Sequence, residues 1–188
     1  MKFRTILADP PWEQPLSGKR NRVKGGMQLE TLPYPTMPLA SICRMPIGDY
    51  AAEDCHCWLW TTNAFLEAGF TVLRAWGFKF LAPIHWIKPS GAGNYVIHRT
   101  QTILLGYFNR CTFDQLRYFP NIIETPGDPA RHSQKPEASY ALIEKVSHEP
   151  RLELFARRKR IGWHAYGNEV ETDLLDAVHP AGFEFSPS

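Results

Sequence analysis

Two consecutive prolines, Pro10 and Pro11, end the first apolar segment of this 188-residue chain. Residues 3–8 read as a buried strand, and neither proline can donate the backbone hydrogen bond that would continue it. Asp9 is therefore expected at the carboxyl end of a strand, which is the edge where open α/β sheets bind ligands. A carboxylate held between a strand and two rigid rings has few conformations available, so Asp9 is the first candidate for chemistry.

Strand-like and helix-like segments alternate along the rest of the chain. We expect strands over residues 57–62, 78–88, 101–108, 121–124 and 151–155, and helices over residues 36–44, 65–76 and 136–148. Asn63 suits the N-cap of the second helix. The turn formers after Lys88 indicate that the strands over residues 78–88 and 101–108 form an antiparallel pair or mark a second turn in the sheet. This alternation predicts one α/β domain over residues 1–188, with helices on both faces of the sheet.

The charge of the chain is nearly balanced. Its 21 basic and 19 acidic residues leave a formal charge of +2, so affinity for nucleic acid has to come from local clusters. Residues 13–38 show little apolar periodicity and read as a mobile basic gate or substrate loop. The basic residues of this first cluster are Lys19, Arg20, Arg22 and Lys24. A second cluster covers residues 157–160, and residues 170–188 read as an irregular tail.

Each basic cluster follows a strand at the same expected edge of the sheet. We therefore expect both clusters to flank the site and to hold phosphates. The alternative is that they are solvated surface segments.

The cysteines do not indicate a metal site. The chain has four, Cys43, Cys55, Cys57 and Cys111, with no C-x-x-C pair, so we expect reduced thiols. In the run Cys55-His56-Cys57, strand alternation would point His56 away from both sulfurs. The chain passes from Met1 directly into the first strand, with no signal peptide or apolar span of membrane length, so we expect a cytoplasmic protein that does not enter a membrane.

The tetrapeptide Asp9, Pro10, Pro11 and Trp12 suits methylation of an exocyclic amino nitrogen on a base. The lone pair of that nitrogen is delocalised into the ring, which makes it a poor nucleophile. The Asp9 carboxylate and the Pro10 carbonyl can each accept a hydrogen bond from one amino proton and so draw the nitrogen towards tetrahedral geometry. Trp12 can then stack on the base. The alternative interpretation is a turn followed by a core tryptophan.

Seven stretches of the chain, in their order, resemble the MT-A family of adenine and adenosine N(6)-methyltransferases. That family contains the catalytic subunit of the mRNA enzyme and bacterial and phage relatives, and it shares the Asp-Pro-Pro-Trp motif. The matching stretches are ILADPPW at 6–12, YPTM at 34–37, WLWTTN at 58–63, WIKP at 86–89, SQKP at 133–136, LELFAR at 152–157 and GNE at 167–169. The likeness covers nearly the whole chain.

The resemblance implies S-adenosylmethionine as the methyl donor. It also implies a circularly permuted, Rossmann-like methyltransferase sheet, in which the catalytic motif comes first and the donor strand comes late. No G-x-G-x-x-G follows a predicted strand, so hydride transfer is not expected. Carried over to this sequence, the resemblance assigns the donor site to Asp9, Lys135, Glu153, Phe155, Arg157, Asn168 and Glu169.

Within that set, the resemblance puts Lys135 near the methionine carboxylate and Arg157 near the ribose or the carboxylate. Asn168 and Glu169 are expected at the adenine edge and the ribose hydroxyls.

The substrate is less defined than the donor. The matching stretches and the first basic cluster give the substrate-binding candidates Trp12, Lys19, Arg20, Arg22, Lys24, Tyr34 and Asn63. Many bacterial members carry His-Glu where this chain has Thr100-Gln101. We expect adenine in DNA, because the chain has no counterpart of the extra amino-terminal domains of the mRNA enzyme.

The alternatives are RNA, a free nucleotide, or a catalytically silent subunit that binds nucleic acid. An adenine in duplex DNA would have to leave the stack to reach Asp9. The oligomeric state stays open, with a homodimer as one option.

Overall fold

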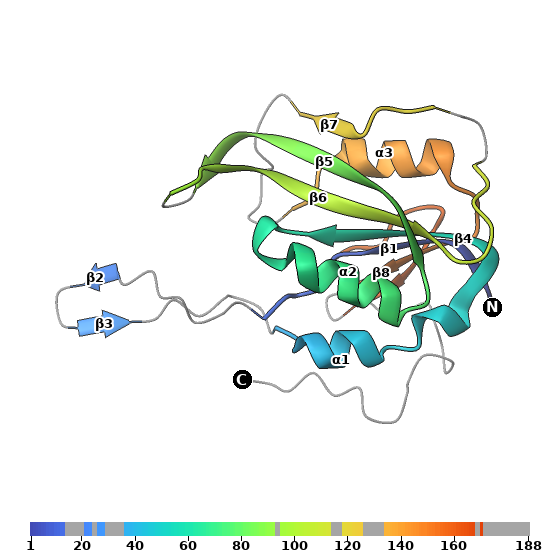
Figure 1. The fold of residues 1–188 in the computed structure, drawn as a ribbon, viewed down its shortest axis with the longest axis horizontal. Helices are drawn as coiled ribbons and strands as arrows, with labels where there is room; N and C mark the ends of the chain where they lie inside the picture. Colours follow the sequence, from blue (N-terminus) through green and yellow to red (C-terminus); the bar gives the residue numbers. More distant parts are fainter. Residues whose placement is uncertain are drawn as a thin grey trace.

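The computed structural model describes residues 1–13, 21–23, 26–28, 36–92, 95–113, 118–125, 134–167 and 170. Its main sheet has seven strands in the order β7-β5-β6-β4-β1-β8-β9 (Figure 1). The strands are β1 Phe3–Ala8, β4 Ala51–Thr61, β5 Lys79–Ala92, β6 His98–Tyr107, β7 Ile122–Glu124, β8 Arg151–Leu154 and β9 Trp163–Tyr166. The helices are α1 Leu39–Arg44, α2 Leu66–Ala75 and α3 Glu137–Val146. Two 3-10 turns, η1 Ile47–Tyr50 and η2 Asn63–Phe65, lie before β4 and before α2, and β2 Asn21–Val23 pairs with β3 Gly26–Gln28 in a separate antiparallel ribbon.

The first strand lies in the middle of the sheet. It pairs in parallel with β4 on one side, where Ile6 lies opposite Cys57, and with β8 on the other, where Leu7 lies opposite Glu153. The expected antiparallel pair is β5 and β6, and β6 is also antiparallel to β4. Because β8 comes late in the sequence yet lies beside β1, the permuted strand order expected from the resemblance is confirmed.

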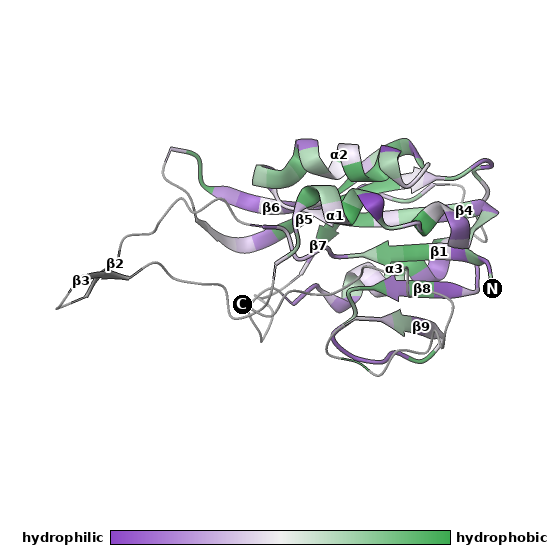
Figure 2. Cartoon of the chain, turned by 90° about the horizontal axis from the view of Figure 1, so that it is seen from below, coloured by the Kyte–Doolittle hydropathy of each residue, from purple (hydrophilic) through white to green (hydrophobic). Residues whose placement is uncertain are grey.

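Both faces of the sheet are covered by helices, as expected. Alternate residues of β1 and β4 point to opposite faces. Ile6 and Leu59 pack with Leu73 of α2 in one buried cluster, whereas Leu7 and Trp58 pack in a second cluster that contains α3 residues. In Figure 2, β1 is hydrophobic along most of its length and α2 carries both hydrophobic and hydrophilic residues, as a central strand and an amphipathic surface helix should.

Local sequence signals explain most of the element boundaries. Gly77 has φ 85°, a left-handed conformation that glycine adopts without steric cost, and it directly follows the last turn of α2. Pro136 precedes α3. The prediction that Asn63 caps the second helix is wrong, because residues 63–65 form η2 and the N-cap of α2 is Phe65. The Asn63 amide instead contacts His98 Nδ1 of β6 at 3.0 Å.

Three strands were missing from the sequence-based prediction: β2 and β3, which lie within the predicted loop over residues 13–38, and β9 of the main sheet. Residues 163–166 form β9, a four-residue strand at the edge of the sheet that pairs in parallel with β8. A strand this short, beside a run of basic residues and Gly162, carries little periodicity of its own, so its pairing with β8 decides its conformation.

The segment Cys55-His56-Cys57 folds as the alternation predicts. Both cysteines are buried on the α2 face, and His56 is buried on the opposite face, where its Nδ1 lies 2.8 Å from Ser147 Oγ. All four cysteines are free thiols. Among the residues that the structure describes, no group of His, Cys, Asp or Glu side chains could hold a metal ion. In that same part of the chain, no helix has the length and apolarity needed to cross a membrane.

Burial of His56 predicts acid sensitivity. Burial lowers the pKa of His56 from 6.5 to about 4, with the charge of His148 adding to the shift. The unfolded chain therefore binds a proton more readily, so the contribution of His56 to stability is complete above pH 6.5 and is lost as the pH falls towards 4. We expect the free energy of unfolding to fall by about 3 kcal/mol across that window.

Urea denaturation across a pH series measures this effect. A His56→Gln variant should lose most of that pH dependence, whereas His98→Gln, at an exposed position, should keep it. Equal pH dependence in the wild type and His56→Gln would assign the acid sensitivity to other groups.

Candidate functional site

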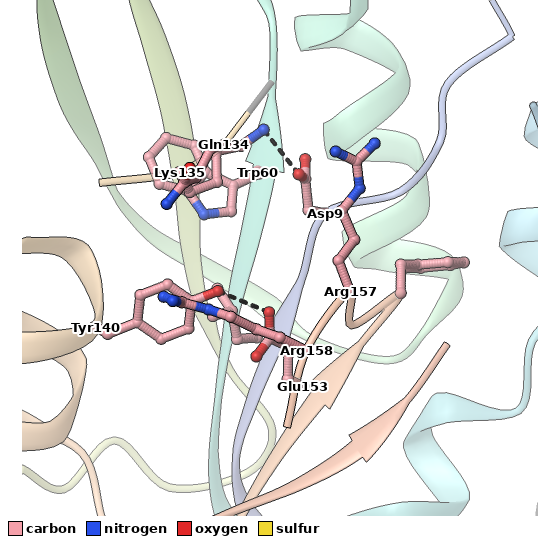
Figure 3. Close-up of a pocket in the computed structure, with 10 residues that line it drawn as sticks. Asp9, Trp60, Gln134, Lys135, Tyr140, Glu153, Arg157 and Arg158 are labelled. Atoms are coloured by element: carbon pink, nitrogen blue, oxygen red, sulfur yellow. Dashed lines mark hydrogen bonds and ion pairs between the residues drawn. The ribbon is translucent and has the colours of Figure 1, made fainter. Parts of the chain in front are cut away.

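A pocket of about 390 Å³ lies where the carboxyl ends of β1, β4 and β8 meet (Figure 3). It is lined by Leu7, Asp9, Trp60, Gln134, Lys135, Tyr140, Glu153, Phe155, Arg157 and Arg158. From β1 the chain goes by way of α1, on one face, to β4. It reaches β8 on the other side of β1 by way of α3, on the opposite face. The strand order thus reverses between β1 and β8, and this reversal point is where open α/β sheets bind ligands.

The backbone after β1 is fixed by hydrogen bonds through both prolines. The Trp12 amide donates to the Pro10 carbonyl at 2.9 Å, which makes a three-residue turn, and the Met37 amide donates to the Pro11 carbonyl at 2.8 Å. The Pro10 carbonyl keeps a second lone pair after accepting this bond. Asp9 is therefore held in one position at the end of β1, as its sequence context predicts.

Asp9 forms an ion pair with Lys135. The Lys135 Nζ lies 2.7 Å from Asp9 Oδ2, and the lysine side chain is only 11% exposed, whereas Asp9 is 38% exposed. The same Nζ lies 5.3 Å from the ring centroid of Trp60, within the range of a cation–π interaction. Lys135 comes from the segment that enters α3, so the pair joins that segment to the first strand.

A second carboxylate lies deeper in the pocket. Tyr140, on the first turns of α3, donates its hydroxyl to Glu153 Oε1 at 2.7 Å (Figure 3). Burial raises the pKa of Glu153 above its ordinary value, and the charge of Asp9 raises it further, while the bond from Tyr140 opposes the shift. Burial also raises the pKa of Tyr140, so this hydroxyl is a hydrogen-bond donor at neutral pH.

Replacing Tyr140 with phenylalanine should leave the Glu153 carboxyl buried without its donor. We expect the free energy of unfolding to fall by about 1–2 kcal/mol. The bond favours the ionised carboxylate, so the loss should be larger at about pH 8 than at about pH 5. Thermal denaturation at both pH values measures it. Tyr118→Phe, at an 86% exposed tyrosine, is the control, and an equal loss in the two variants would contradict this role.

Arg157 and Arg158 of the second basic cluster line the pocket, and Arg158 and Arg160 are tied to α3. Arg158 pairs with Glu137, and Arg160 pairs with both Glu137 at 2.6 Å and Glu144 at 2.7 Å. The Arg160 guanidinium also lies over the Tyr140 ring, at 4.4 Å. The expectation that this whole cluster holds phosphates is therefore not supported for Arg158 and Arg160, whose charges are paired with carboxylates of α3.

The backbone at the end of β8 has an uncommon conformation. Phe155 has φ 62°, in the left-handed region that residues other than glycine rarely adopt. Just after it, Ala156 packs against Gly167, where an added Cβ would lie 2.2 Å from the Ala156 carbonyl oxygen. Only glycine fits there. Gly167, which directly precedes Asn168, therefore lies beside the end of β8. Strained backbone of this kind gathers at functional sites.

The structure brings together five of the predicted donor-site residues, which are Asp9, Lys135, Glu153, Phe155 and Arg157. Asn168, Glu169, Tyr34, Lys19, Arg20 and Lys24 lie outside the described residues, and for Arg22 only the backbone, in β2, is described. Asn63 lies at the same edge, one strand away from β1, bonded to β6. Its predicted contact with substrate stays a prediction.

The stacking role predicted for Trp12 is not supported. The Trp12 ring is 7% exposed and lies in the core on the α2 face, stacked on Phe65 with 5.6 Å between ring centroids. Asp9 points to the α3 face, so the side chains of Asp9 and Trp12 lie on opposite sides of the sheet. The alternative interpretation, a core tryptophan after a turn, describes Trp12 correctly.

Sequence reasoning missed four other pocket residues, which are Leu7, Trp60, Gln134 and Tyr140, whereas Arg158 belongs to the second basic cluster, which was expected to flank the site. Tyr140 carried a usable signal: it is an aromatic residue with a polar tip on the buried face of a predicted helix, and such a hydroxyl needs a partner. Trp60 alternates with Leu59 along β4, so its face could be assigned only once the position of α3 was known.

This sheet order, with a pocket at its reversal point and a carboxylate at the end of the first strand, defines a Rossmann-like α/β enzyme of the methyltransferase class. The chain belongs to the MT-A70 family, whose sequence profile matches residues 3–169. Methyltransferases of this family use S-adenosylmethionine as the methyl donor.

Several named relatives align with most of the chain. It is 25% identical to "Type II methyltransferase M.MunI" of a Mycoplasma species, over 93% of this chain and 81% of that protein. It is 29% identical to "N(6)-adenine-specific methyltransferase METTL4" of Mus musculus, over 89% of this chain and 37% of the relative. It is 27% identical to "N(6)-adenosine-methyltransferase catalytic subunit METTL3" of Homo sapiens, over 95% of this chain and 29% of that protein. The chain therefore spans most of the bacterial relative and less than half of the two animal ones.

Proposed function

We propose that this protein transfers a methyl group from S-adenosylmethionine to the N(6) amino group of adenine in DNA. The observation that carries the proposal is the Asp9 carboxylate, held by Lys135 at the pocket where the strand order reverses. The relatives M.MunI, METTL4 and METTL3 are named as methyltransferases, which supports methyl transfer, and the names of METTL4 and METTL3 specify the N(6) position. DNA is favoured because the chain covers 81% of M.MunI, a type II methyltransferase, but only minor parts of the animal relatives.

The pocket fits the donor in size and chemistry. A volume of about 390 Å³ lies within the range of small-molecule sites, and the walls combine apolar rings with charges of both signs. Lys135 and Arg157 are suited to the methionine carboxylate, whereas Glu153 can accept hydrogen bonds from the amino or hydroxyl groups. Phe155 and Trp60 supply apolar surface. When bound, S-adenosylmethionine supplies an electrophilic methyl group on a sulfonium.

The protein's own groups act on the acceptor nitrogen. Asp9 accepts a hydrogen bond from one amino proton and the free lone pair of the Pro10 carbonyl accepts a hydrogen bond from the other, which localises the nitrogen lone pair and stabilises the positive charge that develops. Lys135 orients the Asp9 carboxylate, because its own position is set by the Trp60 ring.

One experiment tests the reaction and the substrate together. The protein is incubated with methyl-labelled donor and separately with duplex DNA, single-stranded DNA, RNA and free adenine nucleotides, and the products are digested to nucleosides. Label on N(6)-methyladenine from DNA supports the proposal. Label from RNA or nucleotide alone would keep the chemistry and overturn the substrate. Label on cytosine alone, or none despite donor binding, would overturn the chemistry, and the latter would favour a silent nucleic-acid-binding subunit.

We also expect the protein to act in the cytoplasm. Its oligomeric state, with a homodimer as one option, is measured by light scattering of the purified protein.

A further inference from the structure

The strands β5 and β6 continue past the edge of the sheet where the pocket lies. The last pair between β4 and β6 is Thr61 with Thr102, whereas β5 and β6 stay paired from there out to Ala92 and His98. Because β5 runs parallel to β1, this extension leaves the sheet from the same edge as Asp9. Figure 1 shows the two strands projecting beyond α2, and we call the described residues 86–92 and 95–101 the hairpin arm.

The end of the hairpin arm is both apolar and exposed. Tyr95 is fully exposed, and Val96 and Ile97 are each more than half exposed. His98 and Arg99 follow directly and are also exposed. Nothing in the packing of the sheet requires an aromatic ring and two branched side chains in solvent at this position, so these residues are available to a ligand.

The arm is also free of acidic residues. No Asp or Glu occurs anywhere from residue 68 to residue 113, although the whole chain contains 19 of them. Lys88 and Arg99 line a shallow surface hollow of about 480 Å³ beside the arm, together with Ile87, Pro89 and two residues at the end of β7, Glu124 and Thr125. The cations Lys88 and Arg99 lie on either side of the exposed Tyr95 ring in the sequence, and the arm itself carries no carboxylate that would repel phosphates. This combination suits a nucleic acid, whose phosphates are negative and whose bases stack on aromatic rings.

A contact of His98 ties the hairpin arm to the end of β4. The Asn63 amide bonds to His98 Nδ1 at 3.0 Å, and β4 is the strand that carries Trp60. Within the arm, Arg99 Nε donates to the Lys88 carbonyl at 3.1 Å, and Lys88 Nζ lies 5.8 Å from the Trp86 ring centroid. The two cations are therefore held together on a paired scaffold rather than on a loose loop.

We propose that the hairpin arm is a docking surface for the nucleic-acid strand that carries the target base. Lys88 and Arg99 bind phosphates, and Tyr95 stacks on a base outside the pocket. This inference rests on the proposed function, because it requires a nucleic-acid substrate at the Asp9 pocket. A protein partner is less favoured, because the only two charged residues of the arm, Lys88 and Arg99, are both cations.

The test compares two triple variants of matched chemistry. The arm variant is Lys88→Ala, Tyr95→Ala and Arg99→Ala. The control variant is Lys79→Ala, Arg110→Ala and Tyr118→Ala, which removes the same residue types at the opposite ends of β5, β6 and β7, where all three are exposed. Affinity for a short DNA oligonucleotide is measured for each protein across a salt series, and binding of S-adenosylhomocysteine is measured by calorimetry.

We expect the arm variant to bind DNA at least about tenfold more weakly than the control. The slope of log affinity against log salt should decrease by about 0.7 to 0.9 for each of the two lost phosphate contacts. Binding of S-adenosylhomocysteine should be equal in all three proteins, which shows that the pocket is intact.

Other outcomes separate this inference from the proposed function. If the wild type methylates DNA and the arm variant binds DNA like the control, the arm inference is wrong and the function stands. If the wild type neither binds nor methylates any nucleic acid, the proposed function fails first. If the arm variant loses a dimer, measured by light scattering, while its DNA affinity stays normal, the arm binds a second copy of the chain and the inference is overturned.

Discussion

Replacing Asp9 with asparagine should lower the rate of adenine methylation by about 100- to 1,000-fold, with little change in stability. The asparagine amide presents two donors and no charge, so it can neither orient both amino protons nor stabilise the positive charge that develops on the nitrogen. The side chain is 38% exposed and is not packed in the core, so the fold should tolerate the change. Single-turnover kinetics with labelled donor measure the chemical step directly.

The matched control is Asp54→Asn. Asp54 is also an aspartate paired with a cation, Arg4, whose hydrogen bond holds the pKa of Asp54 below its usual value, but it lies near the amino end of β1. That variant should lose stability and keep the methylation rate of its folded fraction. A near-normal rate in Asp9→Asn would remove Asp9 from the proposed reaction, and an equal loss in both variants would point to a general effect of the lost charge.

Replacing Lys135 with alanine should weaken binding of S-adenosylhomocysteine by about 10- to 100-fold, as expected when a charged hydrogen bond is lost. The lysine is 11% exposed and lies close to both Asp9 and Trp60, so its ammonium group is held in one position in the pocket. The methylation rate should fall as well, because Asp9 loses its orienting partner. Affinity for DNA should stay near that of the wild type, since Lys135 is expected to face the donor.

Calorimetry on Lys135→Ala and Lys145→Ala tests this. Lys145 is an exposed lysine in the last turn of α3, so its loss removes the same charge from the neighbouring helix without touching the pocket. Asn168→Ala, from the matching GNE stretch, should resemble Lys135→Ala. Equal donor affinity in all of these proteins would mean that the family assignment of these residues does not extend to donor binding in this chain.

The local signals were sufficient for much of the architecture. The prolines after residue 8 end β1, Gly77 ends α2 and Pro136 begins α3, because each acts on the backbone within one or two residues of its own position. The position of Asp9 at a strand end follows from the same local rule. The late donor strand beside the first one came from the motif order of a resemblance, because no local signal specifies which strands pair.

The assembly of the pocket needed the tertiary structure. Asp9 and Lys135, like Tyr140 and Glu153, come from different elements, and only the packing of α3 on one face of the sheet brings each pair within 2.7 Å. Packing also decides that Trp12 lies in the core although Asp9, three residues earlier, faces the pocket. Sequence spacing determines which residues share a strand or a helix, whereas the face on which a helix packs determines which side chains meet, and that depends on contacts far apart in the chain.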